Sequence, residues 1–137
     1  MKRGNEDAVV AGGVAAVVSG LPSTFCALAA GDDPLEATLA AGSILLRHET
    51  RRTRLLAAAV PIHLALSFGW AFVLERVLPP GREIAGGALA GLGIAALDLG
   101  VVGRRIPRVC ALPLLPQIAD HVAYGATVGY MLARRRR

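Results

Sequence analysis

The sequence predicts an all-α integral membrane bundle of four transmembrane helices, with one shorter interfacial or re-entrant helix. Three observations lead to this fold class: 54% of the 137 residues are apolar, the charged residues are clustered, and the apolar stretches between the clusters are each about 20 residues long. An α-helix needs about 20 apolar residues to cross the hydrocarbon core of a bilayer. We therefore expect a single transmembrane domain over residues 1–137, surrounded by the lipid bilayer.

The first predicted transmembrane helix covers residues 8–30. Gly12, Ala16 and Gly20 recur in it at four-residue spacing, and small residues at this spacing let a second helix approach closely. Pro22 removes one backbone hydrogen bond, which neighbouring hydroxyl groups can compensate, so we expect a kink there. The run also resembles a signal peptide, but acidic residues interrupt its basic start, and we expect the helix to be retained.

A shorter helix is predicted over residues 34–46. Its start is indicated by Asp33 as N-cap, Pro34 at the first helical position and Glu36 in the first turn. The apolar part, residues 37–46, is too short to span a membrane. We expect an interfacial or re-entrant helix, and the sequence leaves open whether it enters the membrane.

The second predicted transmembrane helix covers residues 55–74. His63, Ser67 and Trp70 stand at spacings of four and three residues, which places them on one helix face. This arrangement predicts a polar stripe along an otherwise apolar helix.

The third predicted helix covers residues 84–103 and follows a turn at residues 79–81 that contains two prolines and a glycine. Gly87 and Gly91 repeat the spacing that permits close helix packing, and Asp98 places a carboxyl group within the apolar run. We expect this helix to pack closely against a neighbour.

The fourth predicted helix covers residues 111–133 and is followed by four arginines. Gly125 and Gly129 are a further pair of small residues for helix packing. Asp120 and His121 lie next to each other in this apolar stretch. Adjacent residues on a helix point about 100° apart, so their partners are expected on other helices.

Five polar residues are predicted to lie at similar depth in the membrane and to form a cluster: His63, Ser67, Asp98, Asp120 and His121. Ionisable groups are costly in hydrocarbon and mark the first place to look for function. One interpretation is a buried polar network that fixes the helix packing of a structural or accessory protein, and this is the leading one. The alternative is a hydrated pocket of a small proton- or cation-linked transporter or channel.

The absence of known catalytic motifs from the sequence argues against an enzyme. The sequence has no HExxH, GxSxG or P-loop motif, and Cys26 and Cys110 lack the spacing of metal ligands. We therefore predict no catalytic residue, no metal site and no cofactor. The net charge of +5 comes from arginines that flank apolar segments, which predicts contact with lipid head groups and no binding of nucleic acid.

The distribution of Lys and Arg residues hardly determines the orientation of the protein in the membrane. Four crossings would place eight Lys and Arg residues on the side of the termini and seven on the other side. Because basic residues favour the cytoplasmic side, this near-tie permits either orientation, including dual insertion as an antiparallel dimer. The glycine-rich faces of the first, third and fourth helices also suggest a homodimer.

A family resemblance rests on several motifs, mainly within residues 60–137. They are His63-xxx-Ser67, Glu75 followed by Pro79-Pro80, the glycine-rich third helix and Asp120-His121-xx-Tyr124-Gly125-xxx-Gly129. Together these motifs resemble small uncharacterised bacterial inner-membrane proteins of the YagU-like kind, although the long extracytoplasmic loop of the larger members is missing. Residues 32–42 and 96–100 resemble a narrower actinobacterial group. The resemblance implies a multi-pass protein of the plasma membrane with both termini cytoplasmic, and it brings no established activity.

Overall fold

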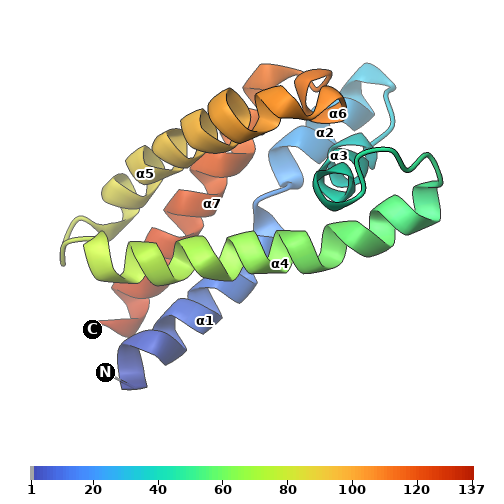
Figure 1. The fold of residues 1–137 in the computed structure, drawn as a ribbon. Coiled ribbons are helices and arrows are strands. Elements are labelled where there is room, and N and C mark those ends of the chain that lie inside the picture. Colours follow the sequence, from blue (N-terminus) through green and yellow to red (C-terminus); the bar gives the residue numbers. More distant parts are fainter. Residues whose placement is uncertain (1) are drawn as a thin grey trace.

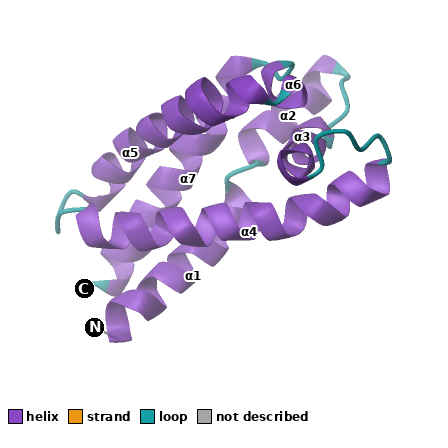
Figure 2. Ribbon diagram, viewed as in Figure 1, coloured by secondary structure: helices purple, strands orange, loops and turns teal. Residues whose placement is uncertain are grey.

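All regular elements in the described part of the chain are helices. The computed structural model describes residues 2–137, with side chains from Gly4 onward (Figures 1 and 2). The α-helices are α1 (Lys2–Val18), α2 (Leu21–Ala30), α3 (Glu36–Leu45), α4 (Arg52–Val77), α5 (Glu83–Leu97), α6 (Pro107–Cys110) and α7 (Leu114–Arg135). A π-helical turn, Asp98–Val102, and a 3-10 turn, Gly103–Arg105, extend α5. The predicted all-α class is confirmed.

In the part of the chain that the structure describes, three helical stretches are long and apolar enough to cross a membrane, where four were expected. They are Gly4–Ala30, Arg52–Val77 and Glu83–Arg105. Large apolar side chains are exposed on the outside of the bundle, as on Leu115, whose exposed fraction is 79%. An exposed apolar surface of this kind is compatible with a membrane protein. The helix α7 has 22 residues, but it carries Gln117, Asp120 and His121 and ends in arginines.

Most helix boundaries differ from the predicted ones by a few residues, and two of the differences have a structural cause. The predicted helix over 8–30 is divided at Ser19 and Gly20 into α1 and α2. The short helix begins at Glu36 because Asp33 accepts a hydrogen bond from the Leu35 N–H (3.0 Å), which holds the preceding residues in a turn.

Two pairs of helices form the body of the molecule. The helix α5 packs along α7, and α4 packs against α1 and, nearer its N-terminal end, against α3. The helix α1 also contacts α7 and so joins the two pairs. Figure 1 shows α4 (green) and α5 (yellow) diverging from their connecting turn, with α7 (red) behind them.

Four of the predicted packing glycines bring the backbones of α5 and α7 into contact. A Cβ atom on Gly87 would meet the Gly125 carbonyl oxygen, and one on Gly125 would meet the Gly87 carbonyl oxygen. A Cβ on Gly91 would similarly meet the His121 carbonyl, and one on Gly129 the Glu83 carbonyl. Because these four glycines make contacts between two helices of the same chain, they do not support a homodimer.

The other two predicted packing glycines lie in different surroundings. A Cβ atom on Gly12 would lie 2.9 Å from the Ala71 Cβ, so Gly12 allows the close approach of α1 and α4. A Cβ on Gly20 would have no atom of the described residues within 4 Å. Gly20 matches the four-residue spacing, but the break between α1 and α2 removes it from the packed face.

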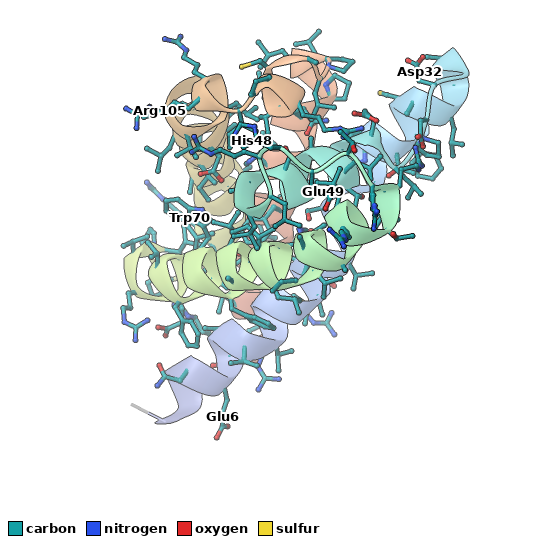
Figure 3. The ribbon with its side chains drawn as sticks, turned by 45° about the vertical axis from the view of Figure 1, so that its right-hand side comes forward. Glu6, Asp32, His48, Glu49, Trp70 and Arg105 are labelled. Atoms are coloured by element: carbon teal, nitrogen blue, oxygen red, sulfur yellow. The ribbon has the colours of Figure 1, made fainter. Side chains whose placement is uncertain are left out.

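Ion pairs gather at both ends of the bundle. At the end that holds the termini, the Arg135 Nε lies 2.5 Å from the Asp7 Oδ1, and the Arg136 Nη1 lies 3.6 Å from the Glu83 Oε1. Figure 3 shows Glu6 at this end of the molecule and Asp32 at the other.

At the opposite end, the Arg108 Nε lies 2.7 Å from the Glu36 Oε1, and the Arg52 Nη1 lies 2.5 Å from the Asp33 Oδ2. Hydrogen bonds from the Arg52 guanidinium and then from the Leu35 N–H lower the pKa of Asp33. This carboxylate therefore stays ionised beside the N-terminus of α4.

Candidate functional site

A cavity of about 690 Å³ lies between the pair α1 and α4, the short helices α2 and α3, and the pair α5 and α7. Most of its lining is apolar. All five residues of the predicted polar cluster lie on its wall: His63, Ser67, Asp98, Asp120 and His121. The structure thus brings these residues to one cavity, although their individual partners differ from one another.

Asp120 caps a helix that is far from it in the sequence. The break after α1 leaves the first N–H groups of α2 without intrahelical partners, as at any helix start. The Ser23 N–H, in the first turn of α2, donates a hydrogen bond to the Asp120 Oδ1 of α7 (2.8 Å). A carboxylate at this place also interacts favourably with the positive end of the helix dipole. Asp120 is therefore a cap supplied by another helix.

The break itself is supported by local hydroxyl groups. The Thr24 Oγ1 donates to the Gly20 carbonyl (2.7 Å), and the Ser23 Oγ donates to the same oxygen (3.3 Å). Pro22 lacks an N–H and fits the first turn of a helix, where that group would have no partner. Instead of the kink expected at Pro22, the helix ends at Val18 and a new helix begins at Leu21, within one apolar segment.

His63 and Tyr124 also bond to backbone groups of other helices. The His63 Nε2 donates to the Ala16 carbonyl (2.8 Å), which ties α4 to α1. The Tyr124 hydroxyl donates to the Ser67 carbonyl, which ties α7 to α4. The Tyr124 hydroxyl is buried, where an unsatisfied polar group would be costly, whereas the His63 side chain is exposed, and the two bonds join three helices. They hold the walls of the cavity together.

Asp98 and His121 form the remaining pair. The His121 Nε2 lies 3.6 Å from the Asp98 Oδ2, which is too far for a direct hydrogen bond. The His121 Nδ1 lies 2.7 Å from the Gln117 carbonyl oxygen. Both side chains are largely but not completely buried and lie on the cavity wall. This pair is the part of the cluster with room for a further group.

The position of Asp98 follows from the π-helical turn that it begins. The Gly103 N–H donates to the Asp98 carbonyl, five residues back, so one extra residue is accommodated in the helix. Such turns are rare and occur frequently at functional sites. A Cβ atom on Gly103 would lie 2.8 Å from the Asp98 carbonyl oxygen, and this crowding fits the glycine at the end of the turn.

The cavity wall carries two carboxyl groups and, besides its histidines, no basic side chain among the described residues. Asp98 and Asp120 contribute the two carboxyl groups, and no Lys or Arg among the described residues lines the cavity. In the same part of the chain, no group of three or more His, Cys, Asp or Glu side chains could hold a metal ion. The wall therefore offers carboxylate and imidazole acceptors for a cation.

Sequence reasoning did not identify the three backbone partners of the cluster, namely the Ser23 N–H and the carbonyls of Ala16 and Gln117, nor the bond from Tyr124 to the Ser67 carbonyl. Pro22 was the available signal for the first of them, because it marks where α2 begins. No family model, curated protein or solved structure matches the chain, so the function has to be argued from the cavity itself.

Proposed function

We propose that the protein is a four-helix, multi-pass protein of the bacterial plasma membrane whose cavity binds a small cation, as in a proton- or cation-linked transporter. The observation that carries this proposal is a cavity of about 690 Å³ with two carboxyl groups and no lining Lys or Arg among the described residues. Its volume lies in the ordinary range for small-molecule sites. The mostly apolar lining suits a ligand with an apolar body.

The fourth span in this proposal is α7. Its 22 residues can extend about 33 Å at 1.5 Å per residue, enough for the hydrocarbon core. Its polar residues Asp120 and His121 face protein and the cavity, where the cost of membrane burial is reduced. The ion pair between Arg135 and Asp7 places the two termini at the same end of the bundle. Termini at one end of the bundle support an even number of crossings, and the family resemblance favours cytoplasmic termini.

Labelling of single cysteines tests the number of spans. Cys26 and Cys110 are both exposed and free, so the background is Cys26→Ser with Cys110→Ser. Cysteines introduced by Arg82→Cys and Arg137→Cys are expected to react with an impermeant thiol reagent from the same side, and Arg47→Cys from the opposite side. Reaction of positions 82 and 137 from opposite sides would show that α7 does not cross. Reaction of every position from both sides would indicate dual insertion.

Trp70 provides a test of cation binding. It is the single tryptophan of the chain and lines the cavity, and Figure 3 shows it on the side of α4 that faces α5. The purified chain in detergent is titrated with benzylammonium, benzyl alcohol and benzoate, which share an apolar body and differ in charge. We expect a saturable change of Trp70 fluorescence that is strongest for benzylammonium and absent for benzoate.

A tryptophan moved to the outside controls for partition of these compounds into detergent. In the variant with Trp70→Phe and Leu115→Trp, the indole lies on the exposed outer surface, and no saturable change is expected. Equal responses from Trp70 and from position 115 would contradict binding in the cavity. Binding of benzoate as tightly as benzylammonium would contradict the proposed preference for cations.

A structural or accessory role is the second candidate. The bonds of Asp120, His63 and Tyr124 to backbone groups of other helices favour it, because they join helices without requiring a ligand. This role predicts that all three benzyl compounds leave the Trp70 fluorescence unchanged. The same titration therefore decides between the two candidates.

A further inference from the structure

We propose that the cation is an organic ammonium ion with N–H groups beside an apolar body, and that it exchanges with a proton at the pair formed by Asp98 and His121. The inference rests on the proposed function and deepens it by naming the ligand class and the coupled ion. Three features of the site support it: the tautomer of His121, the charges around the cavity and the position of the pair on the cavity wall.

The hydrogen bond to Gln117 determines which nitrogen of His121 carries a hydrogen. A carbonyl oxygen only accepts, so the Nδ1 at 2.7 Å from the Gln117 oxygen must be the donor. In neutral His121 the Nε2 then has a lone pair and no hydrogen. This nitrogen is the one that faces the Asp98 carboxyl group.

Neutral His121 and ionised Asp98 consequently present two acceptors to each other across 3.6 Å. Two facing acceptors repel, and they need a donor to bring them together. One solution is a proton on the Nε2, which turns the pair into an imidazolium and a carboxylate. The other is an ammonium ion at the cavity wall, whose N–H groups donate to both the Nε2 and the carboxylate.

Repulsion between neighbouring cations disfavours two positive charges at the pair. Titratable groups that share the cavity wall are Asp120 and Tyr124 on α7 and His63 on α4. The described lining residues of α1, α2 and α3 add no titratable group, and Arg108 of α6 is paired with Glu36. An imidazolium at position 121 and an ammonium ion beside it would repel at short range, so the two cations should exclude each other.

The exchange conserves charge and changes no oxidation state. The Nε2–H bond of protonated His121 breaks, and the proton passes to water or buffer. The lone pair left on the Nε2 accepts an N–H of the incoming ammonium ion, and the Asp98 carboxylate accepts another. The apolar body of the ion occupies the part of the cavity lined by Leu66, Trp70 and Ile94.

Competition with protons is tested by repeating the Trp70 titration with benzylammonium between about pH 5 and 8, where histidine changes charge. Benzylammonium itself stays protonated over this range. If one proton leaves for each bound ion, the apparent Kd falls about tenfold per unit of rising pH until His121 is neutral. A weakly buffered sample should release about one proton per bound ion at the acid end of this range. A Kd that is constant over this range would overturn the exchange.

A second ligand tests the need for N–H groups. Benzyltrimethylammonium has the same charge and a similar body but no N–H, and we expect it to bind at least about tenfold more weakly, as loss of a charge-assisted hydrogen bond implies. Equally tight binding of the two ions would show that charge alone selects the ligand. That result would refute the inference and leave the proposed cation site intact.

Two substitutions test whether the exchange takes place at Asp98 and His121. His121→Gln should make benzylammonium binding independent of pH, and Asp98→Asn should weaken it at every pH. Asp32→Asn, an exposed carboxylate outside the cavity, should change neither property. If either cavity variant fails to fold, the pH titration and the comparison with benzyltrimethylammonium still test the exchange, because both use the unaltered chain. Absence of saturable binding by any cation would instead refute the proposed function.

Discussion

Substitution of Gly87 by alanine is expected to destabilise the protein by about 1–3 kcal/mol, the usual cost of forcing an extra group into a packed interface. The added Cβ would meet the Gly125 carbonyl oxygen, and it would also lie close to the Gly129 Cα, at 3.3 Å. These are backbone atoms, which cannot rotate away as a flexible side chain can. The two helices must separate along their contact, and thermal unfolding in detergent followed by circular dichroism would measure the loss.

Gly93→Ala is the matched control on the same helix. A Cβ at this position would have none of the described atoms within 4 Å, and alanine has a higher helix propensity than glycine. The control should leave the stability unchanged or raise it slightly. Equal destabilisation by the two substitutions would contradict the close contact between α5 and α7.

Substitution of Asp120 by alanine is expected to cost about 1–2 kcal/mol, the usual effect of removing a helix cap. The Ser23 N–H would lose its acceptor, so the first turn of α2 should open. Hydrogen exchange of the Ser23 amide would report this opening directly, and thermal unfolding would give the change in stability.

Asp120→Asn separates the hydrogen bond from the charge. The asparagine side chain keeps an oxygen that can accept from the Ser23 N–H, so most of the stability and the amide protection should remain. If the asparagine variant loses as much stability as the alanine variant, the negative charge rather than the hydrogen bond holds α2 in place.

The sequence predicted the fold class and the composition of the cavity wall better than the contacts within it. Apolar segments of membrane-spanning length predict helices regardless of how these helices pack, and the spacing of Gly87 and Gly91 with Gly125 and Gly129 predicted close packing. The contact between Gly87 and Gly125 then follows from complementary small faces on helices joined through a short chain segment.

The partners of the polar residues were beyond sequence reasoning for a physical reason. Asp120 bonds to a backbone N–H that is 97 positions away and is free only because a helix restarts after Gly20. His63 likewise bonds to the Ala16 carbonyl, and backbone groups are the same at every position of a sequence. Local patterns therefore indicated which side chains needed partners but not where those partners were.

The backbone contact between α5 and α7 also bears on how the cavity could open. Helices whose backbones touch cannot slide or separate by small side-chain rotations, so we expect α5 and α7 to move as one rigid unit. The helix α4 is joined to this unit by side-chain contacts only, including the bond from the Tyr124 hydroxyl to the Ser67 carbonyl, so we expect α4 to be the wall that shifts when that bond breaks. A solute that entered the cavity would then pass along the seam between these two units, with Trp70 on the mobile side and Asp98 on the fixed side.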